Sequence, residues 1–193
     1  MFLITNRNLV SEEKYFNTIE KSSKYGVKNI ILREKDLKTD ELIKIYKKIR
    51  ELVSEETKII INSNIEAVNI LKEKFIHLSF NDFKRNLENI KSLDVGVSIH
   101  SINEAMEADR LGASYILVSP IFETKCKPGA IPRGSKFIKE IREKVNCTVV
   151  ALGGINEENF KEVLCAGADD FACMSLLFLS NNIEECLNSF NKI

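Results

Sequence analysis

The sequence predicts a single-domain α/β fold, a TIM (β/α)8 barrel spanning residues 1–193. Short β-rich runs alternate with amphipathic, charged stretches from one end of the chain to the other. Several of these runs are almost continuously apolar, as parallel strands covered on both faces are. A helix, a glycine and a strand also follow one another three times. Barrels of this kind typically have about 250 residues, so we expect short loops.

Eight runs are the strand candidates, and Ile59-Ile-Ile61 and Tyr115-Ile-Leu-Val118 are the most apolar of them. The runs are 2–5, 29–33, 58–62, 75–78, 95–99, 115–119, 148–152 and 171–175. The alternative is a doubly wound open sheet, which usually has a glycine-rich turn after its first strand. Here Asn6-Arg-Asn-Leu9 follows the first strand without a glycine, which favours the barrel.

The helices between these runs carry start and stop signals. Ser101-Ile-Asn-Glu104 has the pattern of a capping box, in which the serine and the glutamate side chains satisfy backbone N–H groups. Glycine favours the left-handed turn that ends a helix. The predicted helices run from near Ser11 to Gly26, from Ser101 to Gly112 and from near Asn156 to Gly167.

The bulk composition excludes several classes of partner. Lysine plus arginine equals aspartate plus glutamate at 28 each, so there is no strong basic field to bind nucleic acid or an anionic membrane. We expect no signal peptide and no membrane span, and therefore a cytoplasmic protein. The five cysteines lack C-x-x-C spacing, which favours reduced, mostly buried thiols over a zinc site. A homo-oligomer is compatible with the sequence.

In barrels, residues at the carboxyl ends of the strands form the active site. Gly153-Gly154 after the seventh strand is the pattern of a phosphate cradle, although the same pair also suits a plain tight turn. Arg33 and Lys35 alternate along a segment expected to be extended, so both would face one side and bind an anion. The neighbouring Glu34 and Asp36 equally suit a solvated loop. The residues collected by this rule are Arg33, Lys35, Asn62, Ser63, Asn64, Ser79, Asn81, Asp82, Ser98, His100, Thr124, Lys127, Arg133, Gly153, Gly154 and Ser175.

The two histidines have different interpretations. His77 lies inside a strand candidate, which favours a packed or hydrogen-bonded role. His100 follows the fifth strand, where general acid/base catalysis and a hydrogen bond to nearby backbone are equally good readings. Asp82 is a candidate Mg²⁺ ligand, but one carboxylate makes a poor metal site. Residues 122–134 form a long loop of the kind that binds ligands.

The motifs in order resemble the thiamine phosphate synthase family and its TenI-type sister proteins, which include thiazole tautomerases. The similar segments are Ile31-Leu-Arg-Glu-Lys-Asp36, Val97-Ser-Ile-His-Ser101, Ser119-Pro-Ile-Phe-Glu-Thr-Lys-Cys-Lys127, Ala151-Leu-Gly-Gly-Ile155 and Ala166-Gly-Ala-Asp-Asp-Phe-Ala-Cys-Met-Ser175. The resemblance implies a barrel that binds a thiazole phosphate. In the synthases it also implies Mg²⁺ and hydroxymethylpyrimidine diphosphate.

The resemblance also implies roles for individual residues. Arg33 and Lys35 would bind diphosphate with help from Lys127, Asn62 would hold the pyrimidine, and Asp82 would bind Mg²⁺. Ser98 would lie near the reacting centre. The thiazole phosphate would be held by Thr124, Gly153, Gly154 and Ser175.

The loop with Phe122-Glu-Thr-Lys-Cys-Lys-Pro-Gly129 and Arg133-Gly134 resembles that of the TenI-type proteins. Three departures also bear on the choice between the two branches. Ile31 stands where the synthases have glutamine, and Ser63 stands where they have the first Mg²⁺ aspartate. The tautomerases have a catalytic histidine where this chain has Pro120, and His100 is our candidate substitute. We therefore expect first a TenI-like protein that binds a thiazole phosphate and isomerises it without a cofactor. The alternatives are the Mg²⁺-dependent synthase and a non-catalytic regulatory binding protein.

Overall fold

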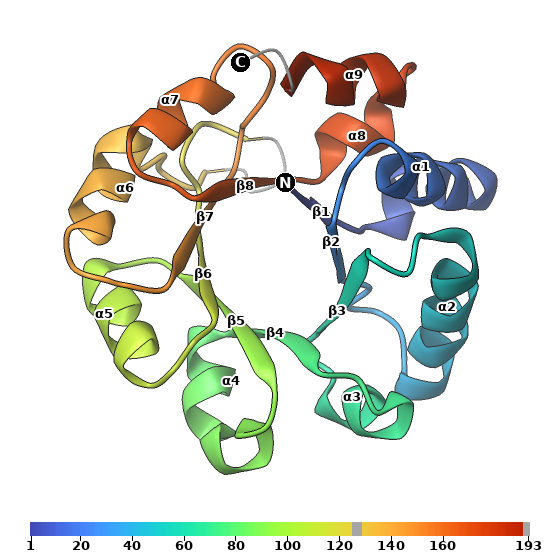
Figure 1. Ribbon diagram of the computed structural model, residues 1–193, viewed down its shortest axis with the longest axis horizontal. Helices are drawn as coiled ribbons and strands as arrows, with labels where there is room; N and C mark the ends of the chain where they lie inside the picture. Colours follow the sequence, from blue (N-terminus) through green and yellow to red (C-terminus); the bar gives the residue numbers. More distant parts are fainter. Residues whose placement is uncertain (125–128, 191–193) are drawn as a thin grey trace. The chain divides into compact units, whose positions relative to one another are not determined.

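The computed structural model describes residues 1–124 and 129–190. Eight parallel strands form a closed barrel in the order β1 to β8, with helices between them (Figure 1). The predicted (β/α)8 fold is therefore confirmed. The chain divides into two compact units, so the prediction that residues 1–193 form one domain stays a prediction. Unit 1 comprises Met1–Glu73 and the described residues from Cys173 onward, and unit 2 comprises Lys74–Ala172.

In unit 1, the strands pair in parallel, and Ile30 and Ile31 lie beside Ile59 and Ile60. Buried isoleucines fill β2 and β3, as the continuous apolar runs predict. Helices α1, α2 and α3 flank these strands (Figure 1). The elements are β1 (Phe2–Ile4), a 3-10 turn (Arg7–Leu9), α1 (Glu12–Lys24), β2 (Asn29–Leu32), α2 (Thr39–Leu52), β3 (Lys58–Asn62), α3 (Ile65–Leu71), α8 (Ser175–Leu179) and α9 (Ile183–Phe190).

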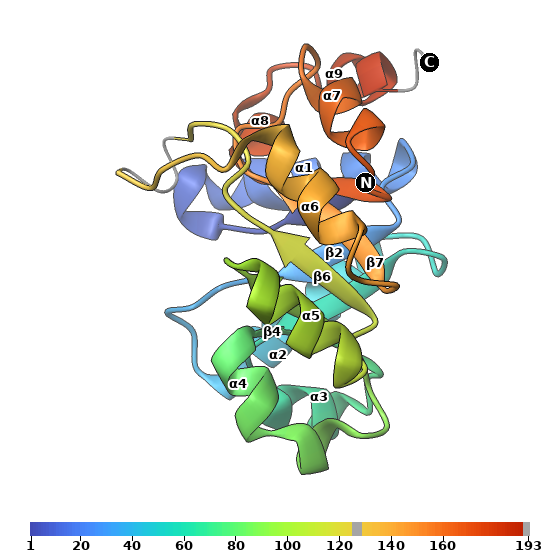
Figure 2. The ribbon, with the colours of Figure 1, turned by 90° about the vertical axis from the view of Figure 1, so that its left-hand side faces the viewer.

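In unit 2, the register places His77, Gly96 and Tyr115 side by side on three neighbouring strands. Helices α5 and α6 pack over β6 and β7 (Figure 2). The elements are β4 (Phe75–Ser79), α4 (Phe80–Arg85), a 3-10 turn (Leu87–Ile90), β5 (Asp94–Ile99), α5 (Ile102–Arg110), β6 (Tyr115–Val118), α6 (Gly134–Arg142), β7 (Thr148–Leu152), α7 (Phe160–Cys165) and β8 (Asp170–Cys173), of which Cys173 belongs to unit 1.

Most predicted boundaries agree with the structure, and three local predictions were wrong. The helix predicted from near Asn156 to Gly167 begins later, because α7 starts at Phe160. The preceding residues form a turn in which the Asn156 side chain accepts from the N–H groups of Glu158 and Asn159. Glu104 accepts from the N–H of His100 instead of that of Ser101, so the capping box reaches one residue further back. Ser175 is the first residue of α8 because β8 ends at Cys173.

No helix in the described part of the chain is both long enough and apolar enough to cross a membrane. Among the described cysteines, Cys173 and Cys186 are buried and Cys165 is exposed. Cys126 lies outside the described residues.

Candidate active site

A buried carboxylate organises the strand ends of unit 1. Glu34 accepts hydrogen bonds from the hydroxyl groups of Thr5 and Tyr15 at 2.6 and 2.9 Å, and from the backbone N–H of Arg7 at 3.0 Å. Thr5 and Tyr15 are almost completely buried, and burial raises the pKa of the Tyr15 phenol, which stays a hydrogen-bond donor. Glu34 thus ties the segment after β2 to β1 and α1.

The two cations of this segment lie on either side of Glu34. The backbone N–H of Arg33 donates to the Thr5 hydroxyl at 2.9 Å, which fixes the start of the segment. Lys35 lies in a turn and is exposed, so the extended alternation that we predicted for Arg33 and Lys35 is wrong beyond the end of β2. Among the residues that the structure describes, neither side chain forms an ion pair, whereas Arg7 pairs with Asp36. Both cations are therefore available to an anion.

The end of β3 supplies amide and hydroxyl groups. The Asn62 amide donates to the Ser63 hydroxyl at 2.9 Å, and Ser63 has a left-handed backbone with φ of 61°. Asn64 caps α3 by accepting from the N–H of Ala67 at 2.8 Å. Asn62 and Ser63 are thus placed at a strand end as predicted, and their roles toward a substrate stay predictions.

In unit 2, Ser98 belongs to a hydrogen-bonded row of side chains. The His77 Nε2 lies 2.8 Å from the Ser98 hydroxyl, and the His77 Nδ1 lies 2.9 Å from the Tyr115 hydroxyl. The two rings stack with centroids 5.6 Å apart, and both residues are buried. His77 therefore has the hydrogen-bonded role that its position in a strand indicates.

A second cluster of unit 2 surrounds His100. The His100 Nδ1 lies 2.9 Å from the Ser119 carbonyl oxygen, which can only accept, so Nδ1 carries a proton and donates it. Arg133 donates to the His100 carbonyl oxygen at 2.8 Å. These residues line a cavity of about 490 Å³ together with Pro120, Ala130 and Ile131. The structure provides the backbone hydrogen bond, and the acid/base role of His100 stays a prediction.

Gly153 and Gly154 let two loops approach each other closely. Both have left-handed backbones, with φ of 108° and 66°. A Cβ atom at Gly154 would lie 2.4 Å from the Glu123 carbonyl oxygen, and one at Gly153 would lie 3.0 Å from the Pro120 Cα. The N–H of Phe122 donates to the Gly153 carbonyl oxygen at 2.9 Å, which joins the loop after β6 to the end of β7. A tight turn thus accounts for the glycines, and phosphate binding stays a prediction.

Asp82 is held at the start of α4. Its carboxylate accepts from the Ser79 hydroxyl at 2.6 Å, and Ser79 accepts in turn from the N–H of Asp82. Within residues 1–124 and 129–190, no group of three or more His, Cys, Asp or Glu side chains is arranged to hold a metal ion. Asp82 is therefore a single carboxylate at the start of α4, and its role as a Mg²⁺ ligand stays a prediction.

The loop after β6 holds the last predicted site residues. Thr124 is half-buried at the edge of the described segment, and Lys127 lies outside the described residues. Ser175, expected at the end of a strand, begins α8, a helix of five residues.

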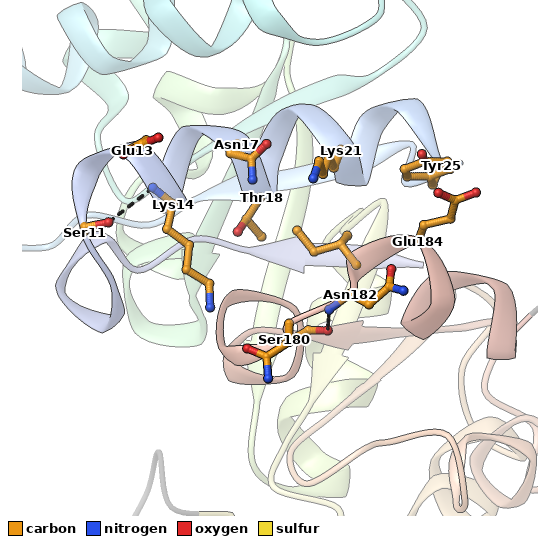
Figure 3. Close-up of a pocket in the computed structure, with 12 residues that line it drawn as sticks. Ser11, Glu13, Lys14, Asn17, Thr18, Lys21, Tyr25, Ser180, Asn182 and Glu184 are labelled. Atoms are coloured by element: carbon orange, nitrogen blue, oxygen red, sulfur yellow. Dashed lines mark hydrogen bonds between the residues drawn. The ribbon is translucent and has the colours of Figure 1, made fainter.

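Another cavity, of about 310 Å³, lies against α1 and the segment between α8 and α9 (Figure 3). Lys14 and Lys21 line it, but so do Glu13 and Glu184, and its walls are helices and a loop instead of strand ends. Its charges balance, so we do not assign it to the active site.

Sequence reasoning missed Glu34 and Tyr115 as site-organising residues. Glu34 was interpreted as a solvated neighbour of two cations, yet it is only 6% exposed. A carboxylate between two cations directly after an apolar strand was the available signal. For Tyr115, the only signal was a phenol at the start of an otherwise apolar run.

Residues 1–177 match the family described as thiamine monophosphate synthase. The chain is 37% identical over 181 residues to the putative thiamine-phosphate synthase 2 of Aquifex aeolicus (strain VF5), covering 91% of this chain and 96% of that protein. It is 33% identical over 191 residues to the thiamine-phosphate synthase of Clostridium acetobutylicum, covering 96% and 90%. The solved thiamine phosphate pyrophosphorylase from Pyrococcus furiosus superposes with a TM-score of 0.87 at 27% identity, covering 99% of this chain and 93% of that one. The family match, the similar sequences and the similar solved structure agree, and the chain belongs to the thiamine monophosphate synthase family of enzymes.

Proposed function

We propose that this enzyme is a thiamine-phosphate synthase, which joins hydroxymethylpyrimidine diphosphate to a thiazole phosphate and releases diphosphate. The observation that carries the proposal is the pair of available cations, Arg33 and Lys35, on a segment anchored by the buried Glu34. Relatives with this name, at 37% and 33% identity, favour the synthase over the TenI-like tautomerase that we expected first.

The reaction breaks the bond between the pyrimidine methylene carbon and the diphosphate oxygen, and the electron pair leaves with the diphosphate. The thiazole nitrogen then donates its own pair to the methylene carbon and forms the new C–N bond. Negative charge grows on the leaving oxygen, so cations placed there lower the barrier. Arg33 and Lys35 fit this role, because a guanidinium binds phosphate oxygens in a bidentate manner and an ammonium binds them as a point charge.

Other residues would position the substrates. Asn62 would bind the pyrimidine through its amide, and Ser98 would donate a hydrogen bond near the reacting centre. In unit 2, Thr124 and the turn at Gly153 and Gly154 would hold the thiazole phosphate. Asp82 would hold Mg²⁺, which when bound neutralises charge on the diphosphate. We place this chemistry in the cytoplasm.

The proposal is tested by measuring thiamine phosphate formation by the purified protein with both substrates and Mg²⁺. Reactions that omit one substrate or Mg²⁺ are the controls. Calorimetry on the same preparation measures the binding of the thiazole phosphate. Product that requires both substrates supports the synthase. Binding of neither substrate, by a protein that unfolds cooperatively, contradicts the thiamine assignment.

The TenI-like activity is the second candidate, and Ser63 favours it because a hydroxyl replaces the carboxylate of the synthases. Tight binding of the thiazole phosphate without coupling would support this candidate. The variant Ser63→Asp separates the two, since a second carboxylate should increase Mg²⁺-dependent coupling where the diphosphate site is present. Ser63→Asn, which has the same shape without the charge, is its matched control.

A further inference from the structure

Three neighbouring strands of unit 2 hold a row of side chains at one level of the sheet. His77 of β4 pairs with Gly96 of β5, and Gly96 pairs with Tyr115 of β6. Ser98 lies two residues beyond Gly96 on β5, and alternate residues of a strand share one face. The row therefore consists of an imidazole on β4, a glycine without a side chain on β5 and a phenol on β6. The Ser98 hydroxyl lies two residues further along β5.

The absence of a side chain at Gly96 allows the row to form. A Cβ atom at Gly96 would lie 1.9 Å from Cζ of Tyr115 and 2.3 Å from its hydroxyl oxygen. The Tyr115 ring thus lies across the backbone of β5, in the space that any other residue at 96 would fill. From there its hydroxyl reaches His77 on the far side of β5, at 2.9 Å from Nδ1.

The chemistry of the groups involved favours one direction for these hydrogen bonds. Burial raises the pKa of the Tyr115 phenol, so it keeps its proton, and a buried O–H needs an acceptor. A neutral imidazole has one donor and one acceptor nitrogen. If Tyr115 donates to Nδ1, the proton of His77 must lie on Nε2, 2.8 Å from the Ser98 oxygen.

We propose that Tyr115, seated over Gly96, fixes His77 as the Nε2–H tautomer, which donates to Ser98 and leaves the Ser98 hydroxyl proton to be donated to the substrate. Ser98 would contact the substrate, whereas His77 and Tyr115 are positioning residues. In the opposite tautomer, the Ser98 hydroxyl would donate its proton to His77 Nε2 and would not be able to donate it to the substrate. The assignment to a catalytic step rests on the proposed function, but the tautomer does not.

The tautomer is measured directly by ¹⁵N NMR of the imidazole nitrogens in the whole protein. The chain has only two histidines, and the spectrum of a His100→Gln variant assigns each signal. We expect the proton of His77 on Nε2 in the unmodified protein and a mixture of tautomers in Tyr115→Phe. A proton on Nδ1 of His77 in the unmodified protein, alone or together with one on Nε2, overturns the proposal whatever the protein catalyses.

Kinetics tests whether the row acts through Ser98. Tyr115→Phe should lower kcat for coupling by about tenfold, the effect of one hydrogen bond, and leave the KM values nearly unchanged. In a Ser98→Ala background the same change should have no further effect, because the two residues act as a unit. Additive losses in the double variant overturn the proposal.

Tyr46→Phe is the matched control, because Tyr46 donates to Glu73 in unit 1 and is not part of the row. It should leave both kcat and the His77 spectrum unchanged. If the unmodified protein forms no thiamine phosphate, the proposed function fails while the NMR result still decides the tautomer.

Discussion

The strand ends of the two units are organised by different chemistry. In unit 1, a buried carboxylate, Glu34, collects three donors and holds two cations beside it. In unit 2, the groups around Ser98 are neutral, an imidazole and a phenol joined by hydrogen bonds. A charged anchor suits a segment proposed to bind an anion, and a neutral row suits a group proposed to keep a proton in one place. Because the two units use different groups, the cations of unit 1 and the Ser98 hydroxyl of unit 2 can be disrupted separately.

The largest effect is expected from removing the charged anchor. Glu34→Ala leaves the Thr5 and Tyr15 hydroxyls and the Arg7 N–H without their acceptor. At about 1–3 kcal/mol for each of these three donors, the free energy of unfolding should fall by at least about 3 kcal/mol in urea denaturation. Glu34→Gln keeps an acceptor oxygen and should lose less. Glu20→Ala, an exposed glutamate of α1, should change stability by less than about 0.5 kcal/mol. An equal loss in all three variants would contradict the role of Glu34.

The cations of unit 1 should affect one substrate only. Arg33→Ala should raise KM for the pyrimidine diphosphate and lower kcat/KM by about 10–100-fold, the effect of a lost charge-assisted hydrogen bond. Binding of the thiazole phosphate, measured by calorimetry, should not change. Lys28→Ala, at the other end of β2, is the control and should behave as the unmodified enzyme. Equal weakening of both substrates by Arg33→Ala would mean that Arg33 supports the fold instead of binding diphosphate.

The close approach in unit 2 gives a smaller effect on stability. Gly154→Ala combines a left-handed backbone with a contact of 2.4 Å to the Glu123 carbonyl oxygen. Gly26→Ala has the left-handed backbone alone, since no atom lies within 4 Å of its Cβ position. Strain costs about 1–2 kcal/mol in both variants, and the collision should add roughly 1–3 kcal/mol to Gly154→Ala. The two variants are compared by thermal unfolding. Equal losses of Tm would contradict the prediction, because they would show that the backbone at Glu123 moves aside at little cost.

The smallest effect is expected at His100. His100→Ala removes the hydrogen bond to the Ser119 carbonyl oxygen and should cost about 1 kcal/mol of stability or less, because the side chain is exposed. His100→Asn retains an N–H donor and should recover part of this loss. A fall in turnover by more than 100-fold in both variants would instead support the acid/base role.

The sequence predicts the barrel well because apolar runs and helix-ending glycines are local signals. The bounds 58–62 and 148–152 coincide with β3 and β7. The roles of Glu34 and Tyr115 depend on partners that are distant in sequence, 29 residues for Thr5 and 38 residues for His77. Strand register decides which of these side chains meet, and a single sequence carries no direct record of register. The start of α7 was missed for a local reason, because Asn156 can begin a turn as readily as a helix.

The crowding between Gly96 and Tyr115 also restricts how this pair of positions can change over time. An alanine at 96 would force the ring of a tyrosine at 115 to move, because its methyl group would overlap the ring. A small residue at 115 is compatible with either glycine or alanine at 96. Successive single substitutions from glycine and tyrosine to alanine and a small residue avoid this overlap when position 115 becomes smaller before position 96 becomes larger. The opposite change, back to glycine and tyrosine, avoids it when glycine returns to position 96 first.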